Sequence, residues 1–511
     1  MRELANPVWQ ADLVSASINP AANQSVCAQF EQQVERTPEA LALICEGRQM
    51  TYRELEARVN QLAWHLKTQY QIESESFVGL LLGRSERMLI SMLAVLKAGG
   101  AYVPISPDYP AKRIDYILRD ANPKVLITEK RFASAVERFQ ELFYWDDWPD
   151  AGEEAAMVPR SNLPEPEQLA YLMYTSGSTG VPKGVLTEHG NLSNFISWCI
   201  DEYRHSTFDI VYAGTPYGFD LSNIEFYFPL AIGRPIRLLP ASQMVGLYLR
   251  RDRRVLLNTV PSLVQELLKT RELLNNVSVL NLGGEAVPLS LGRVLRSYPG
   301  MEIRNMYGPT ETTSTAINYR IDGATSPEML IGKPIAMTVV YILDEEMRQV
   351  PIGTRGEIYI GGKGVARGYW NRPELTQERF LDDPFTPGER LYRTGDLGMY
   401  LPDGNLRFFG RNDNQIKLHG FRIELDEIGR QLEGHESVRE AVAGLKKSER
   451  GDKLVAVCSL CAEVSAEALI AYLKDILPPY MLPDEIIFRE NFPLTPAGKI
   501  DRSALFTEGR I

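Results

Sequence analysis

A short apolar run, a helix-patterned segment and a second apolar run follow one another between residues 77 and 128. FVGLLLG at 77–83 predicts a buried strand, and SERMLISMLAVLKA at 85–98 has apolar residues at helical spacing. PKVLIT at 123–128 predicts the next strand. A strand, a helix and a strand over this distance make a right-handed crossover, so the chain should build a parallel sheet with helices packed on its faces.

The rest of the chain extends this pattern into two predicted domains. Its 511 residues exceed the roughly 250–300 that one core usually serves. The glycine-broken strands TVVYILD and GEIYIGG predict an antiparallel, barrel-like portion, and turn signals near 402–412 precede a compact α+β pattern. We therefore predict an α/β fold. A large N-terminal domain, residues 1–412, would hold βαβ subdomains plus a β-barrel-like portion, and a small mobile C-terminal α+β domain would take residues 413–511.

Charge and hydropathy limit the partners. The net charge of −11 argues against nucleic acid or an anionic membrane as a partner. No apolar run approaches the roughly 18–20 residues that span a bilayer, and MRELANPVWQADL lacks the apolar core of a secretory signal. The five cysteines are odd in number, which favours a reducing cytoplasm. Cys458 and Cys461 form a lone C-x-x-C in a strand-like run, which we interpret as two core cysteines rather than a metal site.

Five polar segments interrupt the predicted strands. In YTSGSTGVPKG, 174–184, small residues would let a polyphosphate approach closely, with backbone N–H groups, hydroxyls and Lys183 as donors. This segment lacks the Gly-Lys-Ser/Thr of a P-loop, and its composition alone is more typical of a flexible loop than of a phosphate site. The other four segments, each an ordinary turn when taken alone, are NMYGPTETT at 305–313, YRTGDLG at 392–398, FFGRNDNQIKLHGFRIEL at 408–425 and PLTPAGKIDR at 493–502.

In this order the five segments resemble the core motifs of the adenylate-forming superfamily of acyl-CoA synthetases, luciferases and peptide-synthetase adenylation domains. The details look like the amino-acid adenylation domains of nonribosomal peptide synthetases, and the resemblance covers nearly the whole chain. It implies ATP-dependent activation of an amino acid to its aminoacyl-AMP with release of pyrophosphate, followed by transfer to the phosphopantetheine thiol of a carrier protein. Supporting segments are MTYREL, LKAGGAYVPISPDYP, GEIYIGGKGVARGYWNRPELT and PPYMLPDEI.

The resemblance also implies which residues bind ATP and Mg²⁺. The loop Thr175, Ser176, Gly177, Ser178, Thr179, Gly180 and then Lys183 would hold the phosphates, with Asn305 and Tyr307 at the adenine, Thr310 beside them, Glu311 on Mg²⁺, Asp396 at the ribose and Arg411 near ribose and phosphate. Lys499 would reach the substrate carboxylate and the α-phosphate, and Asp413 would be the hinge of the small domain. Lys499, Glu311 and Thr175 are thus the expected catalytic residues.

Asp220, in YGFDLSNIEF, distinguishes subclasses within this resemblance. An aspartate here would pair with the α-ammonium of an amino acid and penalise an acid that lacks one, whereas otherwise it is a helix N-cap. The remaining pocket positions carry no charge, which favours a small or medium uncharged amino acid: alanine, serine, threonine, proline or a β-amino acid. They are Leu221, Ile224, Thr259, Asn281, Gly283, Met306, Ser314 and Thr315.

The sequence leaves two alternative functions open. A CoA ligase would run the same adenylation with CoA as acceptor, and a non-catalytic family member would act as a binding module. No phosphopantetheine-type serine segment follows PAGKIDR, so the sequence is interpreted either as a free-standing enzyme or as an excised domain. The pattern leaves undetermined the amino acid and its stereochemistry, the pathway product, the carrier partner, the oligomeric state and any need for a small activator protein.

Replacing Lys499 by alanine should slow adenylate formation strongly while leaving folding and ATP binding nearly intact. A mobile cation that neutralises two approaching anions acts mainly in the transition state, so kcat should fall more than KM rises. Steady-state ATP–pyrophosphate exchange measures both constants. Near-normal exchange in the Lys499→Ala variant would contradict this role.

Overall fold

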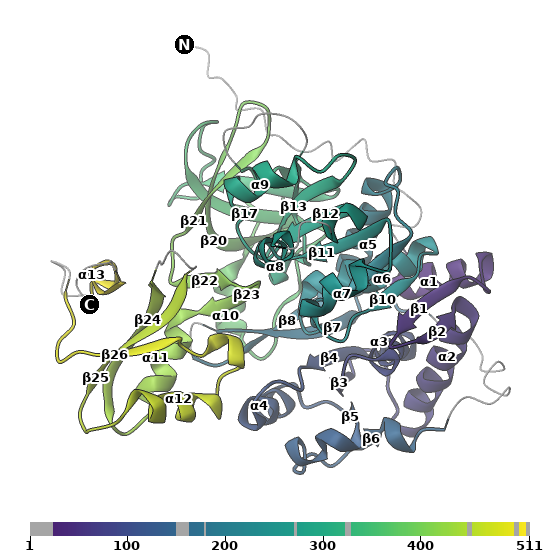
Figure 1. Ribbon diagram of the computed structural model, residues 1–511, viewed down its shortest axis with the longest axis horizontal. Helices are drawn as coiled ribbons and strands as arrows, with labels where there is room; N and C mark the ends of the chain where they lie inside the picture. The colour runs from purple at the N-terminus through teal and green to yellow at the C-terminus, as the bar shows by residue number, and fades with distance from the viewer. Residues whose placement is uncertain are drawn as a thin grey trace.

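The computed structural model describes residues 24–149, 163–177, 180–269, 273–321, 329–446, 452–494 and 500–506. The large N-terminal part contains two sheets with parallel centres and one antiparallel sheet, and a smaller C-terminal part holds two further small sheets (Figure 1). Within these described ranges, none of the helices combines the length and apolar character required to span a membrane.

The first large sheet has seven strands. β3 pairs in parallel with β4 on one side and with β5 on the other, so the stretch interpreted as one crossover contains two. The missed strand, AYVPI, is short and contains Pro104, which is disfavoured in a central strand. In order across the sheet the strands are β18 (Gly368–Tyr369), β8 (Lys183–Glu188), β7 (Leu169–Thr175), β4 (Ala101–Ile105), β3 (Phe77–Leu81), β5 (Val125–Thr128) and β6 (Leu142–Tyr144).

The second large sheet has nine strands, and its central six are parallel. These six are short runs with mostly buried side chains, as expected for strands covered on both faces. In order across the sheet the strands are β15 (Lys333–Pro334), β14 (Ile317–Arg320), β13 (Glu302–Tyr307), β12 (Val277–Gly283), β11 (Val255–Thr259), β9 (Ile210–Ala213), β10 (Ile236–Leu238), β1 (Leu41–Cys45) and β2 (Arg48–Thr51).

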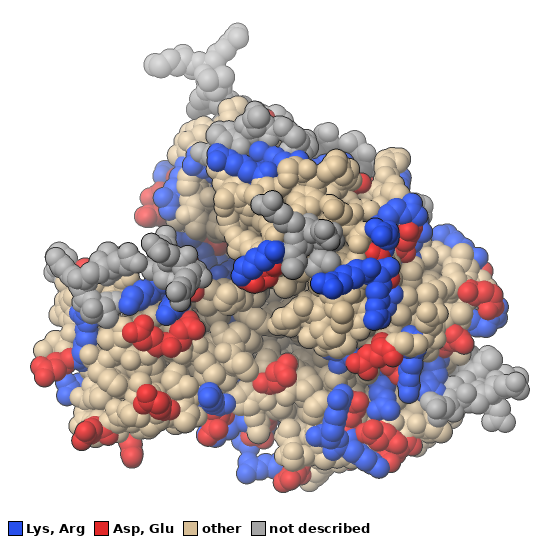
Figure 2. All heavy atoms as spheres, in the orientation of Figure 1, with Lys and Arg blue, Asp and Glu red and all other residues tan. Residues whose placement is uncertain are grey.

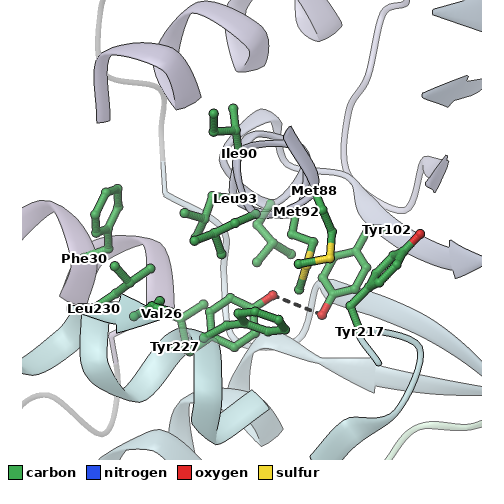
Figure 3. Close-up of a cluster of buried hydrophobic side chains, with 14 of the residues drawn as sticks. Val26, Phe30, Met88, Ile90, Met92, Leu93, Tyr102, Tyr217, Tyr227 and Leu230 are labelled. Atoms are coloured by element: carbon green, nitrogen blue, oxygen red, sulfur yellow. Dashed lines mark hydrogen bonds between the residues drawn. The ribbon is translucent and has the colours of Figure 1, made fainter. Parts of the chain in front are cut away.

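The main core lies between these two sheets and is filled by helices. Figure 3 shows part of it, where Tyr227 donates a hydrogen bond to Tyr102 (3.0 Å) among methionines and leucines. The core helices are α1 (Val26–Arg36), α2 (Tyr52–Gln69), α3 (Glu86–Ala98), α5 (His189–Glu202) and α6 (Asn223–Ile232). The outer faces of the sheets carry α4 (Ala111–Ala121), α7 (Val245–Leu249), α8 (Pro261–Leu268) and α9 (Leu289–Leu295).

The antiparallel portion expected after residue 330 is a sheet of five strands. Each strand pairs antiparallel with its neighbour, and Gly356 of β17 stands opposite Gly398 of β20. Its elements are β16 (Thr338–Leu343), β17 (Gly356–Gly362), β20 (Arg390–Tyr400), β19 (Phe380–Asp382), β21 (Leu406–Arg411) and the flanking helix α10 (Pro373–Arg379).

The C-terminal part has its own apolar core, which includes Ile423, Ile428 and Leu469. The expected boundary at 412/413 falls between β21 and β22, and its exact position stays a prediction. Cys458 is buried in β25, but Cys461 is exposed because the strand ends at Leu460, so the expectation of two core cysteines was wrong for Cys461. The elements are β22 (Gln415–Leu418), β23 (Phe421–Glu424), α11 (Leu425–Glu433), β24 (Val438–Lys446), β25 (Lys453–Leu460), α12 (Ala466–Lys474), β26 (Glu485–Phe488) and α13 (Arg502–Phe506).

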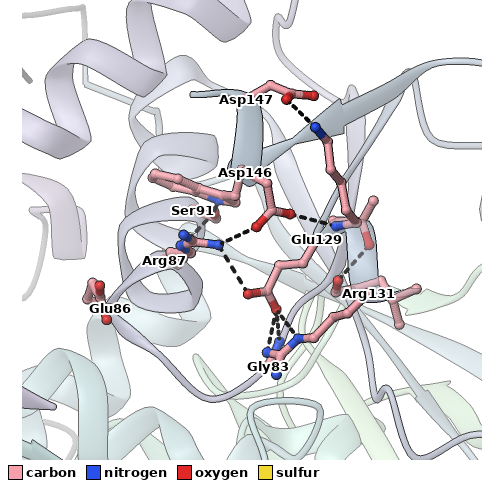
Figure 4. A network of polar contacts seen from close by, with 12 residues as sticks. Gly83, Glu86, Arg87, Ser91, Glu129, Arg131, Asp146 and Asp147 are labelled. Atoms are coloured by element: carbon pink, nitrogen blue, oxygen red, sulfur yellow. Dashed lines mark hydrogen bonds and ion pairs between the residues drawn. The ribbon is translucent and has the colours of Figure 1, made fainter. Parts of the chain in front are cut away.

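A polar network fixes the loops that leave β3 and β5 (Figure 4). The nearly buried Glu129 accepts from the Gly83 N–H (2.9 Å) and pairs with Arg131 (2.6 Å) and Arg87 (3.3 Å). Asp146 also pairs with Arg87 (3.2 Å). The network holds the carboxyl edge of the sheet, where ligands bind in open α/β folds.

His189 should make stability sensitive to acid. The first residue of α5 is 1% exposed, neither ring nitrogen has a partner among the described residues, and burial lowers its pKa to about 4. The pKa of His189 in the folded protein lies below its unfolded value near 6.5. The contribution of the neutral imidazole to the free energy of unfolding is therefore complete above about pH 6.5 and is lost toward pH 4, by about 1.4 kcal/mol per pH unit. Urea unfolding at several pH values should show that the free energy of unfolding falls less steeply toward acid pH in His189→Asn than in the wild type. Identical slopes would contradict the assignment.

Candidate active site

A cavity of about 520 Å³ lies where the two large sheets and the C-terminal part meet. Its walls come from the end of β7, the loop before α6, the ends of β11 and β13, and the β22–β23 hairpin. Three of these walls are carboxyl ends of parallel strands, the usual ligand edge of such sheets. In the space-filling view, mostly uncharged side chains surround the hollow in the middle of the face shown (Figure 2).

The expected phosphate loop begins at the end of β7. Thr175 and Ser176 line the cavity, and Gly180 adopts a positive φ of 85° against the side chain of Arg430. Ser178 and Thr179 lie outside the described residues. Lys183, at the start of β8, is buried, and burial lowers its pKa to about 8 while Glu311 opposes that shift.

Glu311 lies in the short 3-10 turn η8 (Thr310–Thr312) and is fully buried. Its carboxylate pairs with Arg422 (2.7 Å) and Lys183 (3.4 Å) and accepts the hydroxyl of Tyr369 (2.6 Å). Burial alone would raise the pKa of Glu311, but the two cations outweigh it and hold that pKa well below its usual range. The carboxylate is therefore ionised and surrounded by positive charge.

Three of the residues expected around the nucleoside, Tyr307, Asp396 and Arg411, lie next to one another. Asp396 accepts from Arg411 (2.8 Å) and from the hydroxyl of Tyr307. Asn305 does not line the cavity, and its side-chain amide donates to the Leu330 carbonyl (2.7 Å).

Sequence reasoning did not assign a role to Lys417 of β22. Its ammonium lies 5.6 Å from the centre of the Tyr307 ring and lines the same cavity. Its pKa is lowered by burial, with Asp396 and Asp220 opposing that shift. The only available signal was its position within the fourth motif segment.

Six of the nine expected substrate positions line the cavity, and three lie behind its wall. Ile224 and Asn281 are fully buried and do not line it, and a side chain at Gly283 would meet Leu221 at 2.9 Å. Asn281 instead accepts from Tyr203 (2.9 Å). The lining positions are Asp220, Leu221, Thr259, Met306, Ser314 and Thr315.

Several buried polar atoms of the wall have no hydrogen-bond partner among the described residues. Those on residues that line the cavity are Asp220 Oδ2, Thr175 Oγ1, Asn258 Oδ1, Ser314 Oγ, Thr315 Oγ1, Gln415 Oε1 and Arg422 Nε. Burial raises the pKa of Asp220, and the Thr310 hydroxyl opposes this. Unpartnered buried polar groups are costly, so their concentration here indicates a polar ligand.

Backbone geometry sets the directions of the side chains in the cavity wall formed by β13 and the turn after it. Ser314 has a positive φ of 72°, an uncommon conformation that clusters at functional sites. A side chain at Gly308 would come within 2.2 Å of the Ser314 carbonyl, so the turn requires glycine. On β13, the adjacent residues Met306 and Tyr307 face opposite sides of the sheet, Met306 toward the main core and Tyr307 toward the antiparallel sheet.

Glu225 of α6 supports the substrate wall from behind and was also not foreseen. It accepts from the Thr215 N–H (3.0 Å) and from Asn258 (3.1 Å), whose amide also donates to the Leu221 carbonyl (3.0 Å). Burial raises the pKa of Glu225 to about 7. It joins the loop before α6 to the end of β11.

The expected hinge, Asp413, is exposed between β21 and β22. It accepts from Arg411 through two nitrogens (2.6 and 2.7 Å) and from the Gln415 N–H (3.1 Å). Lys499 lies outside the described residues. The hinge role and the Lys499 role both stay predictions.

Residues 30–370 match the family described as AMP-binding enzyme. The chain belongs to this family. Residues 427–499 also match the AMP-binding enzyme C-terminal domain.

Among curated relatives, tyrocidine synthase 2 of Brevibacillus parabrevis is 38% identical over 511 residues, covering 96% of this chain but only 14% of that protein. A four-domain nonribosomal peptide synthetase solved with AMP and glycine is 32% identical, with a TM-score of 0.71, over 96% of this chain and 36% of that chain. A fused adenylation–PCP di-domain from Klebsiella oxytoca is 25% identical, with a TM-score of 0.81, over 91% of this chain and 93% of that chain. The chain thus spans a small part of the large synthetase it resembles.

Proposed function

We propose that this chain activates an amino acid with ATP and then transfers it to a carrier protein. In the first step, a carboxylate oxygen of the amino acid attacks the α-phosphorus, the bond to the β-phosphate oxygen breaks, and pyrophosphate leaves. In the second, a phosphopantetheine sulfur attacks the acyl carbon, the bond to AMP breaks, and the thiol proton is lost. The single observation that carries the proposal is Asp220, whose unpartnered carboxylate oxygen lies in the same cavity as Thr175 and Asp396.

The chemistry of the donors fits ATP and Mg²⁺. Asp396 and Arg411 would hold the ribose, Tyr307 would pack on the adenine, and Thr175, Ser176 and Lys183 would hold the phosphates. Glu311 would ligate Mg²⁺, which usually binds through one or two carboxylates plus substrate phosphates, and the described residues contain no cluster of three acidic, histidine or cysteine groups. The ion supplies charge neutralisation at the phosphates when bound. Positioning and electrostatics provide most of the catalysis in such phosphoryl chemistry.

The wall around Asp220 supports a small or medium uncharged amino acid. The side chains next to it are apolar or hydroxylic, and Leu221 fills the space in front of Gly283. Alanine, serine, threonine, proline and β-amino acids all suit this wall. The ammonium would pair with Asp220, whose buried charge would otherwise stay uncompensated.

A second cavity supports a thiol route to the adenylate. It encloses about 920 Å³ and shares Gly214, Pro216, Ser242, Gln243 and Phe421 with the first cavity. The tyrocidine synthase relative and the adenylation–PCP fusion favour a carrier protein as the thiol donor. CoA could use the same route, but Asp220 favours an amino-acid substrate. ATP dependence and five unpaired cysteines support a cytoplasmic location.

Asp220→Ala should selectively impair amino acids. Removing one partner of a buried charge pair costs about 2–5 kcal/mol, so kcat/KM for the preferred amino acid should fall about 30-fold or more. ATP–pyrophosphate exchange across the common amino acids, a β-amino-acid panel and the matched deamino acids measures this. Asp220→Asn, which removes only the charge, should behave similarly. Equal losses for amino and deamino acids would show a structural role, and no exchange with any amino acid would refute the function.

Asp413→Pro should separate the two half-reactions. The proposed rotation about this residue follows adenylation, and proline fixes φ near −65° and removes one N–H. We expect much of the pyrophosphate exchange to remain while most transfer to a carrier protein is lost. Asp413→Ala is the matched control, since it removes the contacts to Arg411 but leaves φ free. Both half-reactions are measured on one preparation, and proportional loss in a folded Asp413→Pro variant would exclude the hinge.

A further inference from the structure

The C-terminal part occupies hydrogen-bonding groups of the expected phosphate loop. The Gly177 N–H donates to Glu427 Oε2 (3.1 Å), and the Ser176 hydroxyl donates to the Arg422 carbonyl (2.9 Å). Gln431 donates to the Gly180 carbonyl (2.8 Å). In this arrangement two donors that would bind a polyphosphate already have partners.

The charges at this contact have the signs that a metal-bound polyphosphate would have. The carboxylate of Glu427, with its side chain 1% exposed, sits on a loop N–H and on the guanidinium of Arg113 (3.0 Å). The guanidinium of Arg422 sits on the Glu311 carboxylate, where a magnesium ion would bind. An anion therefore faces the loop and a cation faces the metal-binding carboxylate.

Both charges come from one short segment. Arg422 belongs to β23 and Glu427 to the helix α11 that follows it directly, so they reach and leave the site together. An ordinary domain contact does not need them, because buried ion pairs contribute little net stability compared with apolar contacts of similar size. The aromatic side chains of Phe421 and Tyr480 already supply an apolar contact, stacked at 4.0 Å and packed against Phe219.

We propose that Arg422 and Glu427 mimic magnesium pyrophosphate, so that docking of the C-terminal part and binding of metal-bound pyrophosphate exclude each other. The role of this mutual exclusion in the catalytic cycle rests on the proposed function. The docked arrangement can form only after pyrophosphate has left, and once formed it keeps pyrophosphate from returning to attack the adenylate. The same competition makes Mg·ATP binding release the C-terminal part for the next cycle.

An interdomain distance measurement tests this without amino acid or carrier. Cys461 is exposed and the other four cysteines are buried, so a dye on Cys461 and one on an introduced cysteine at the exposed Gln140 report the distance by energy transfer. The probe is inorganic pyrophosphate with Mg²⁺. The transfer efficiency should change saturably with both together and with neither alone.

Two variants sharpen the test. In Arg422→Gln and in Glu427→Gln the docked arrangement loses one charged contact, so half-saturation should need about tenfold less magnesium pyrophosphate. Arg439→Gln, which removes the same charge as Arg422→Gln but at an exposed residue of the same part, should leave the midpoint unchanged. Gln431→Ala, which removes an uncharged contact to the same loop, should shift it only slightly. Far-UV circular dichroism confirms that each variant is folded.

An unchanged distance in the wild type, or a Gln431→Ala shift as large as those of the charge variants, would overturn the mimicry. These results are separable from failure of the proposed function. If the protein catalyses ATP–pyrophosphate exchange but magnesium pyrophosphate leaves the transfer efficiency unchanged, only the mimicry is refuted. If exchange is absent but the transfer efficiency changes saturably with magnesium pyrophosphate, only the amino-acid function is refuted.

Discussion

The arrangement of the site depends on one buried carboxylate. Glu311 is fully buried, and an ionised carboxylate in such a place persists only with cations and donors around it. Its partners come from three separate elements: Lys183 from β8, Tyr369 from β18 and Arg422 from β23. The edge of one sheet and the C-terminal part therefore converge on the end of the other sheet.

The sheets supply the rigidity that this convergence needs. Residues of the cavity wall stand at the carboxyl ends of β7, β11 and β13, and the strands themselves are held by a continuous apolar core. Polar groups that pack behind the wall, such as Glu225, fix its loops. The C-terminal part contributes a hairpin and a helix, so its proposed movement would leave β7, β11 and β13 in place.

Much of the fold follows from the sequence because strands and helices have distinct apolar periods. Strand 77–81, helix 86–98 and the antiparallel strands 338–343 and 356–362 were all foreseeable, whereas β4 was hidden by its proline. The motif order brought Thr175, Glu311 and Asp396 into one region. Contacts between the N-terminal and C-terminal parts could not be predicted. The sequence around Arg422, Lys417 or Glu427 does not indicate that each faces a residue more than a hundred positions away.

The sequence also does not show how far behind the cavity surface a side chain lies. Asn281 and Gly283 lie on β12 near the cavity but behind its surface, and Asn305 turns to a backbone carbonyl at 330. A side chain's distance from a ligand depends on the packing of its neighbours, such as Leu221 over Gly283. Spacing along the chain carries no information on that packing.

The alternation of Met306 and Tyr307 along β13 has an evolutionary consequence. Under the proposed function, neighbouring codons specify a residue of the wall for the acid and a residue that packs on the nucleoside, yet their side chains lie on opposite faces of one strand. Mutations on the first face can accumulate and change which acid is chosen while the second face stays intact. A lineage of such chains can therefore diversify in the building block it selects while retaining one energy source.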